Sequence, residues 1–183
     1  DATWSILACS HLASRSSSPL QVVPFGESRT TTPSIAVLGT DAVVAALPAT
    51  PVQLAHACLL AGYDHVVPAS WGDELLATEC LRELEARGPV PAIQCSCPRV
   101  AARLLRLGAD LAPLIVSLVP PPVAVARYLR THFGETRVRI TYVGRCPSGS
   151  DPAFDAHFAP GELLDRLAEH GIDPIDQPTA FDS

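Results

Sequence analysis

The feature that most constrains this chain is a regular alternation of short apolar runs and capped helical segments, which begins at residue 34. The run Ser34–Leu38 is apolar, ends at Gly39 and predicts a buried strand. The next segment predicts a helix, because Thr50 can cap its first turn and Gln53 can complete a capping box. Gly62 marks the end of that helix. A strand followed by a helix is therefore the first structural unit of the chain.

The same unit repeats along the sequence. Further strands are expected at residues 65–67, 91–94 and 138–143, and further helices at 73–87, at 98–107, from Pro122 and from Pro160. This alternation predicts an α/β fold of three layers, in which a mostly parallel sheet carries helices on both faces. The strands are continuous apolar runs, as is typical of sheets covered on both sides. We expect one α/β domain over residues 34–183.

The helix at 73–87 is expected to be amphipathic. One face carries its apolar side chains, namely Leu75, Leu76, Cys80 and Leu84. Residues 1–33 differ, because from residue 10 they are rich in Ser, Thr and Pro and show no hydrophobic period. They predict an extended N-terminal arm, which lies either in solvent or on a partner.

Composition narrows the choice of partner. The formal net charge of −6 argues against nucleic acid. No apolar run reaches the roughly 18 residues that a transmembrane helix needs. Hydrophobic residues make up 48% of the chain and charged residues 17%, which favours a protein partner that covers part of the surface. Trp4, Arg127 and Arg130 are candidate partner-binding residues, with a solvated helix face as the alternative for the arginines.

The positions of the cysteines indicate both burial and chemistry. The six are Cys9, Cys58, Cys80, Cys95, Cys97 and Cys146. Cys58 and Cys80 lie on apolar helix faces and are expected to be small buried hydrophobes in a reducing compartment. Cys95 and Cys97 follow the strand at 91–94, and Cys146 follows the strand at 138–143. Ligands bind at the carboxyl ends of parallel strands, so these three are the candidate site residues.

Three segments carry a resemblance to a known family. They are Ile93–Pro98, Val116–Arg127 and Tyr142–Pro147. Their order and spacing, with similarity over residues 33–176, resemble the C-terminal domain of the large subunit of iron-only hydrogenases. The resemblance is closest to a shorter, sensor-like or accessory branch of that family.

The resemblance implies an α/β lobe that binds an iron–sulfur cluster bridged to a diiron site. It places cluster ligands at Cys97 and Cys146, and it puts Ser96 where hydrogenases have a proton-relay cysteine. The family lysine three residues after the second ligand is replaced by Gly149, and the family methionine is absent from Leu118–Pro120. The family's later cysteine motif, which supplies two further ligands, is not in this sequence. Hydrogenase activity is therefore not expected.

Two functions remain open. The first is a non-catalytic accessory or structural subunit of a larger redox or membrane assembly, which is cytoplasmic and holds no cofactor. The second is an iron–sulfur redox or sensor module, in which Cys95, Cys97 and Cys146 hold a 4Fe–4S cluster together with Cys9 or a partner residue. The chain could also be one piece of a longer hydrogenase-like protein that carries the missing ligands.

Other chemistries have less support in the sequence. A nucleophilic Cys146 lacks an assignable base. A disulfide between Cys95 and Cys97 would be strained and labile. The histidines show no ligand spacing with the cysteines, which disfavours zinc.

Overall fold

The main body of the protein is a parallel sheet of four strands in the order β2-β1-β5-β6. The computed structural model describes residues 32–134 and 137–179. The strands are β1 (Ser34–Leu38), β2 (His65–Pro68), β5 (Arg139–Val143) and β6 (Ala156–Phe158). All three pairings in this sheet are parallel. Strands β1 and β5 form its centre, so both of their faces need cover.

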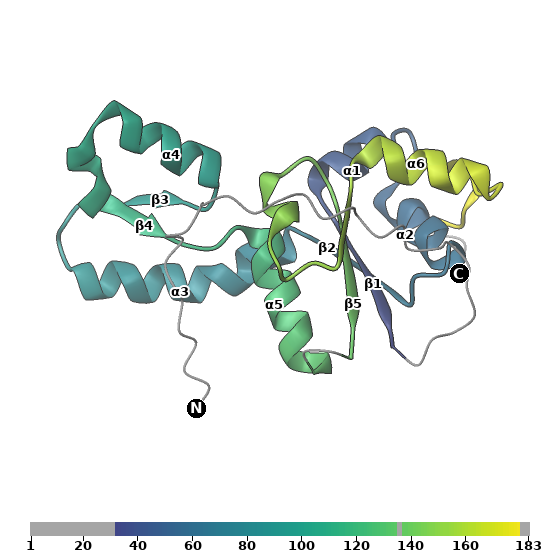
Figure 1. The fold of residues 1–183 in the computed structure, drawn as a ribbon, viewed down its shortest axis with the longest axis horizontal. Coiled ribbons are helices and arrows are strands. Elements are labelled where there is room, and N and C mark those ends of the chain that lie inside the picture. Colours follow the sequence, from purple (N-terminus) through teal and green to yellow (C-terminus); the bar gives the residue numbers. More distant parts are fainter. Residues whose placement is uncertain (1–31, 135–136, 180–183) are drawn as a thin grey trace.

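Helices supply that cover on both faces (Figure 1). They are α1 (Thr40–Ala45), α2 (Pro51–Leu60), α5 (Pro121–Phe133) and α6 (Pro160–Glu169). Alternate residues of β1 enter two separate cores, because successive side chains of a strand point to opposite faces. Ile35 and Val37 pack with α5, whereas Ala36 and Leu38 pack with α1, α2 and α6. The result is the three-layer arrangement expected from the sequence.

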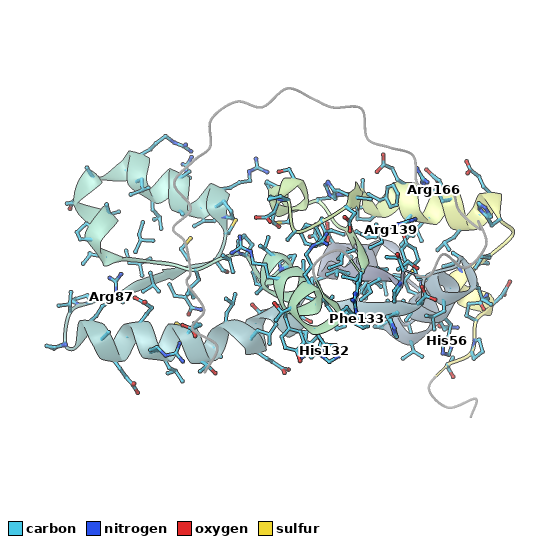
Figure 2. The ribbon with its side chains drawn as sticks, turned by 60° about the horizontal axis from the view of Figure 1, so that its bottom comes forward. His56, Arg87, His132, Phe133, Arg139 and Arg166 are labelled. Carbon is cyan, nitrogen blue, oxygen red and sulfur yellow. The ribbon has the colours of Figure 1, made fainter. Side chains whose placement is uncertain are left out.

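A smaller lobe extends from this body. It consists of α3 (Trp71–Arg87), β3 (Ile93–Cys95), α4 (Pro98–Leu107) and β4 (Ile115–Ser117). Strands β3 and β4 pair in parallel as a separate two-stranded sheet, with α3 and α4 on opposite sides of it (Figure 1). Leu76, Cys80, Val116 and Leu118 form its small core. Arg87 ties the end of α3 to β4, because its guanidinium donates to the carbonyl oxygens of Pro113 and Ile115 (Figure 2).

The start of α2 is fixed by the signals read from the sequence. The hydroxyl of Thr50 accepts from the Gln53 backbone N–H at 3.3 Å, and the Gln53 side-chain oxygen accepts from the Thr50 N–H at 2.9 Å. The Gln53 amide nitrogen also donates to the carbonyl oxygens of Ile175 and Gln177, at 2.8 and 2.9 Å. One buried side chain therefore caps a helix and anchors the C-terminal segment.

The α/β class and its helix-covered parallel sheet are confirmed, but the strands divide differently. The strand predicted at 91–94 belongs to the small sheet and not to the main one. Strands β4 and β6, helix α1 and three short 3-10 helices are not predicted from the sequence. The 3-10 helices are η1 (Ala109–Leu114), η2 (Pro147–Ser150) and η3 (Pro174–Asp176).

Helix α3 also departs from expectation in one respect. Leu76 and Cys80 face the small core, but Leu84 is 40% exposed. Leu84 follows Leu76 by eight residues, which turns it about 80° around an ideal helix. Within the described residues, no helix has the length and apolarity to cross a membrane.

Candidate functional site

The carboxyl ends of β1 and β5 form the topological switch point of the main sheet. The chain runs from β1 outward to β2, and from β5 outward to β6 on the other side. The loops that leave β1 and β5 therefore diverge at their shared edge, which is where open parallel sheets place their ligands. Cys146 lies on the loop after β5, so the structure puts this predicted residue at the expected edge.

Asp41, in the first turn of α1, connects this helix to the loop after β5. Its carboxylate accepts a hydrogen bond of 2.6 Å from the backbone N–H of Arg145. A side chain added at Gly144 would collide with the Tyr142 hydroxyl and approach the Asp41 carboxylate at 3.0 Å. Glycine is thus required where the chain leaves β5, because Asp41 and Tyr142 already fill the space.

Tyr142 is the buried polar group of the site. Its ring stacks on His157 with centroids 5.4 Å apart, and its other neighbour is Phe154 at 5.2 Å. Burial, with smaller contributions from the nearby Cys146 and Asp41, raises the pKa of Tyr142 to about 12, because these surroundings disfavour a charged phenolate. Tyr142 is therefore a neutral phenol at physiological pH.

The loop that carries Cys146 is fixed by contacts within the loop and by contacts with His157 of β6. The Ser148 hydroxyl lies 2.9 Å from the Cys146 sulfur, and the thiol packs partly against the core. The His157 Nε2 lies 2.6 Å from the Gly144 carbonyl oxygen. A Cβ at Gly149 would lie 2.6 Å from the His157 ring. The imidazole thus occupies the space that a side chain at residue 149 would need.

Cys95 and Cys97 lie together on the small lobe. Cys95 ends β3, is buried, and its sulfur lies 3.4 Å from the Cys97 carbonyl oxygen. Cys97 is partly exposed and occupies the N-cap position of α4, where its side chain forms no capping hydrogen bond. These two residues follow the two-stranded sheet, whereas Cys146 follows the four-stranded sheet. Cys95 and Cys97 are thus neighbours in the small lobe, whereas Cys146 belongs to the main body of the protein.

The family resemblance implies an iron–sulfur cluster bound by cysteines. A cubane cluster takes four thiolates. Across residues 32–134 and 137–179, no group of three or more His, Cys, Asp or Glu side chains is placed to hold a metal ion. The described residues therefore do not form a cluster site by themselves.

The candidate partner-binding residues have different surroundings. Arg130 is largely buried and donates to the Ala153 carbonyl oxygen and to Asp155, both at 2.9 Å. Arg127 is more exposed and lies 3.7 Å from Asp151. Both guanidinium groups therefore hold α5 to the segment between β5 and β6. Trp4 and Cys9 lie outside the described residues.

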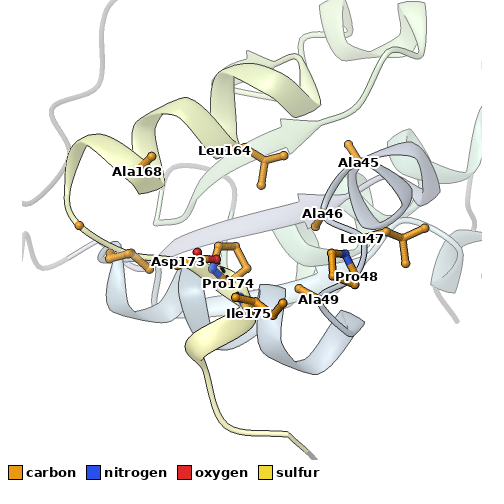
Figure 3. A pocket seen from close by; sticks show the side chains of 12 residues that line it. Ala45, Ala46, Leu47, Pro48, Ala49, Leu164, Ala168, Asp173, Pro174 and Ile175 are labelled. Carbon is orange, nitrogen blue, oxygen red and sulfur yellow. Dashed lines mark hydrogen bonds between the residues drawn. The ribbon is translucent and has the colours of Figure 1, made fainter.

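A groove of about 610 Å³ lies between the end of α1 and the segment after α6 (Figure 3). Its walls are mainly apolar, with Leu47, Leu164 and Ile175 among them. Its carboxylate, Asp173, accepts from the Ile175 backbone N–H at 3.0 Å. That carboxylate is thus used to cap η3.

Three residues of the switch point are not selected by the sequence pattern. Asp41, Tyr142 and His157 come from separate elements, and the parallel register of β1, β5 and β6 brings them together. Asp41 carries a detectable signal, because it is an acidic residue two positions after the glycine that ends a buried strand. Tyr142 and His157 have no such signal in the sequence, since each occupies an ordinary position in a strand.

Comparison with solved structures shows the same fold in hydrogenases. FeFe-hydrogenase HydA1 from Chlamydomonas reinhardtii, in a single-site variant, matches with a TM-score of 0.63 and 21% sequence identity over 84% of this chain and 46% of that one. An apo form of the same enzyme, carrying another substitution, matches with a TM-score of 0.60 and 22% identity over 80% and 45%. The chain thus spans about half the length of these hydrogenases.

Comparison of the sequence with curated proteins found no match. The family model for the C-terminal domain of the iron-only hydrogenase large subunit matches residues 30–149, which include Cys95, Cys97 and Cys146. That match covers more than half of the chain and agrees with the hydrogenase fold. This chain therefore belongs to the family defined by the C-terminal domain of the large subunit of iron-only hydrogenases.

Proposed function

We propose that this chain is a non-catalytic member of its family, which serves as an accessory or structural subunit in a larger protein assembly. On this proposal the hydrogenase-like lobe provides a shape for binding, and hydrogen chemistry is absent. A shared fold at 21% sequence identity does not by itself carry an activity from one protein to another.

The surroundings of Gly149 carry the proposal. The family resemblance places a lysine at this position, three residues after Cys146. Here the His157 ring fills the space beside Gly149, and it is held there by stacking on Tyr142 and by its contact with the Gly144 carbonyl oxygen. A lysine could enter only if that ring moved. The change at residue 149 is therefore accompanied by packing that suits glycine.

The contacts around Asp41 add support. Its carboxylate bonds to the Arg145 N–H and lies beside the Tyr142 phenol at the switch point. A negative carboxylate is a poor neighbour for an anionic cluster, since like charges repel. At the edge of the sheet where a ligand would bind, the space is instead occupied by contacts between the side chains of Asp41 and Tyr142 and the backbone of Arg145.

The test is anaerobic purification, followed by measurement of iron and acid-labile sulfide per chain. We expect colourless protein and no stoichiometric iron, both as isolated and after incubation with ferrous iron, sulfide and reductant. Co-purification from the native source is expected to recover the chain in a larger complex. A stable stoichiometric cluster would overturn the proposal.

An iron–sulfur module is the second candidate, and the positions of two cysteines favour it. Cys97 and Cys146 each follow a parallel strand, each begin a helix, and each are partly exposed. If iron is found, Cys97→Ser and Cys146→Ser should each remove it. Cys80→Ser, which alters a buried thiol on α3, should not. Iron content that is unchanged in the first two variants would exclude this candidate.

A further inference from the structure

Helix α4 carries an uncovered surface of one charge type. Arg99, Arg103 and Arg106 follow the spacing i, i+4, i+7, so they form one stripe along the helix. Beside them, Val100 is 49% exposed and Leu107 is 71% exposed. The helix contains no acidic residue, and none of its residues is fully buried. Its outer surface thus combines apolar side chains with three positive charges.

Helix α3 carries the opposite combination. Leu81 is 61% exposed and Leu84 is 40% exposed, and they belong to an exposed row with Ala77 at the spacing i, i+4, i+7. Glu74 and Glu85 are exposed on the same side of the helix, because they lie three residues before Ala77 and four residues after Leu81. Its outer surface therefore combines apolar side chains with negative charges.

Most charged side chains on the outer faces of α3 and α4 form no ion pair with another described residue. Among the described residues, the acid of α3 that pairs is Glu79, which contacts Arg82. The arginines of α4 form no ion pair with any described residue. Within one chain the charged faces of α3 and α4 cannot contact each other, because the β3–β4 sheet lies between the two helices (Figure 1).

We infer that the outer face of α4 in one copy of this chain docks on the outer face of α3 in a second copy. The two faces match in spacing, since both carry rows at i, i+4, i+7, and they match in charge. Each contact joins different surfaces of the two copies, so it is heterologous. Such contacts repeat from copy to copy and give chains or rings instead of closed two-fold dimers.

A second copy of the chain would cover both exposed faces, those of α3 and α4, whereas an anionic membrane would cover only the face of α4. A membrane would use the arginines and the apolar side chains of α4, but it would leave the acidic-apolar face of α3 without a partner. Copies in a row cover both faces at once. The inference concerns the small lobe, so it is independent of whether Cys146 or Cys97 binds iron.

The first experiment is sedimentation velocity over roughly 5 to 500 µM, because contacts between two helix faces fall among the smaller, weaker interfaces. We expect the average mass to rise with concentration past that of a dimer, and to fall when salt is raised from 0.1 to 1 M, which shortens the Debye length from about 10 Å to about 3 Å. Arg103→Glu with Arg106→Glu should remove the association. Arg137→Glu is the matched control, since it reverses an exposed arginine outside the small lobe.

The second experiment mixes two variants that should each be monomeric. One carries Arg103→Glu and Arg106→Glu on α4, and the other carries Glu74→Arg and Glu85→Arg on α3. In the mixture the intact α4 face meets the intact α3 face, and the two reversed faces are again opposite in charge, so association past a dimer is expected to return. Circular dichroism confirms that each variant is folded.

Three results would overturn the inference. They are a wild-type chain that stays monomeric at the highest concentration, a variant mixture that does not associate past a dimer, and a loss of association in Arg137→Glu equal to that of the α4 variant. Monomeric protein that sediments with vesicles of phosphatidylserine, and loses this on Arg103→Glu, would assign the α4 face to membranes and reject self-association.

Discussion

The backbone N–H of Arg145 donates a 2.6 Å hydrogen bond to the carboxylate of Asp41, which joins the first turn of α1 to the loop after β5. In Asp41→Ala the N–H loses this acceptor, so we expect a loss of about 0.5–1.5 kcal/mol in the free energy of unfolding. The freed loop should also expose Cys146 to faster alkylation. Urea unfolding and mass-spectrometric labelling measure the two effects. Asp41→Asn retains an acceptor oxygen and should keep most of both properties; an equal effect of the two substitutions would contradict this role.

Gly149 should not tolerate a side chain. In Gly149→Ala the new Cβ meets the His157 ring at 2.6 Å, and overpacking of this kind costs about 1–3 kcal/mol of stability. Gly161→Ala is the matched control, because nothing lies within 4 Å of a Cβ there and the residue is in helix α6. We expect that control to be neutral or slightly stabilising. Thermal unfolding compares the two, and equal midpoints would show that His157 moves freely.

Gln53→Glu separates the two roles of Gln53. A carboxylate keeps the acceptor of the capping box but cannot donate to the carbonyl oxygens of Ile175 and Gln177. We expect a loss of about 1–3 kcal/mol, because two carbonyl oxygens would lose their donor and face an anion. Limited proteolysis should then cut near η3 first. Thr50→Ala, which removes the cap alone, should cost about 1 kcal/mol and leave the C-terminal segment protected.

Alkaline pH should destabilise the fold through buried neutral groups. Burial raises the pKa of Cys58 from 9.0 to about 12, and that of Tyr142 from 10.0 to about 12. Both groups ionise first in the unfolded chain, so their contribution is complete below pH 9 and is lost as pH rises toward 12. Each ionised group should lower stability by up to about 1.4 kcal/mol per pH unit. Urea titrations between pH 7 and 10.5 test this. Cys58→Ala should flatten the decline from pH 9, and an unchanged slope would refute the assignment.

Local signals in the sequence were sufficient for the longer elements. The capping box of Thr50 and Gln53 predicts the start of α2, and the apolar run before Cys146 predicts β5, because both depend on neighbouring residues. Strands β4 and β6 were missed, since each is recognised by its pairing with a partner strand. The second sheet was missed for the same reason: strand periodicity does not state which strand pairs with which.

The candidate site divides in a similar way. Cys95, Cys97 and Cys146 could be placed at strand ends, because strand ends can be read from the sequence. Their division between two lobes depends on strand order, which the sequence pattern does not contain. The contact of Gly149 with His157 depends on the pairing of β5 with β6, so it emerges only in three dimensions.

The alternation of β1 between two cores has a consequence for how the protein should open. Because Ile35 and Ala36 belong to different cores, neither face of the main sheet can melt while the other stays intact. The small lobe shares no strand with that sheet, and its core contains few side chains. Amide hydrogens of β3 and β4 should therefore exchange through partial openings, while those of β1 and β5 report the global free energy. Thermal fluctuation would thus begin at the lobe that carries Cys97 and reach Cys146 last.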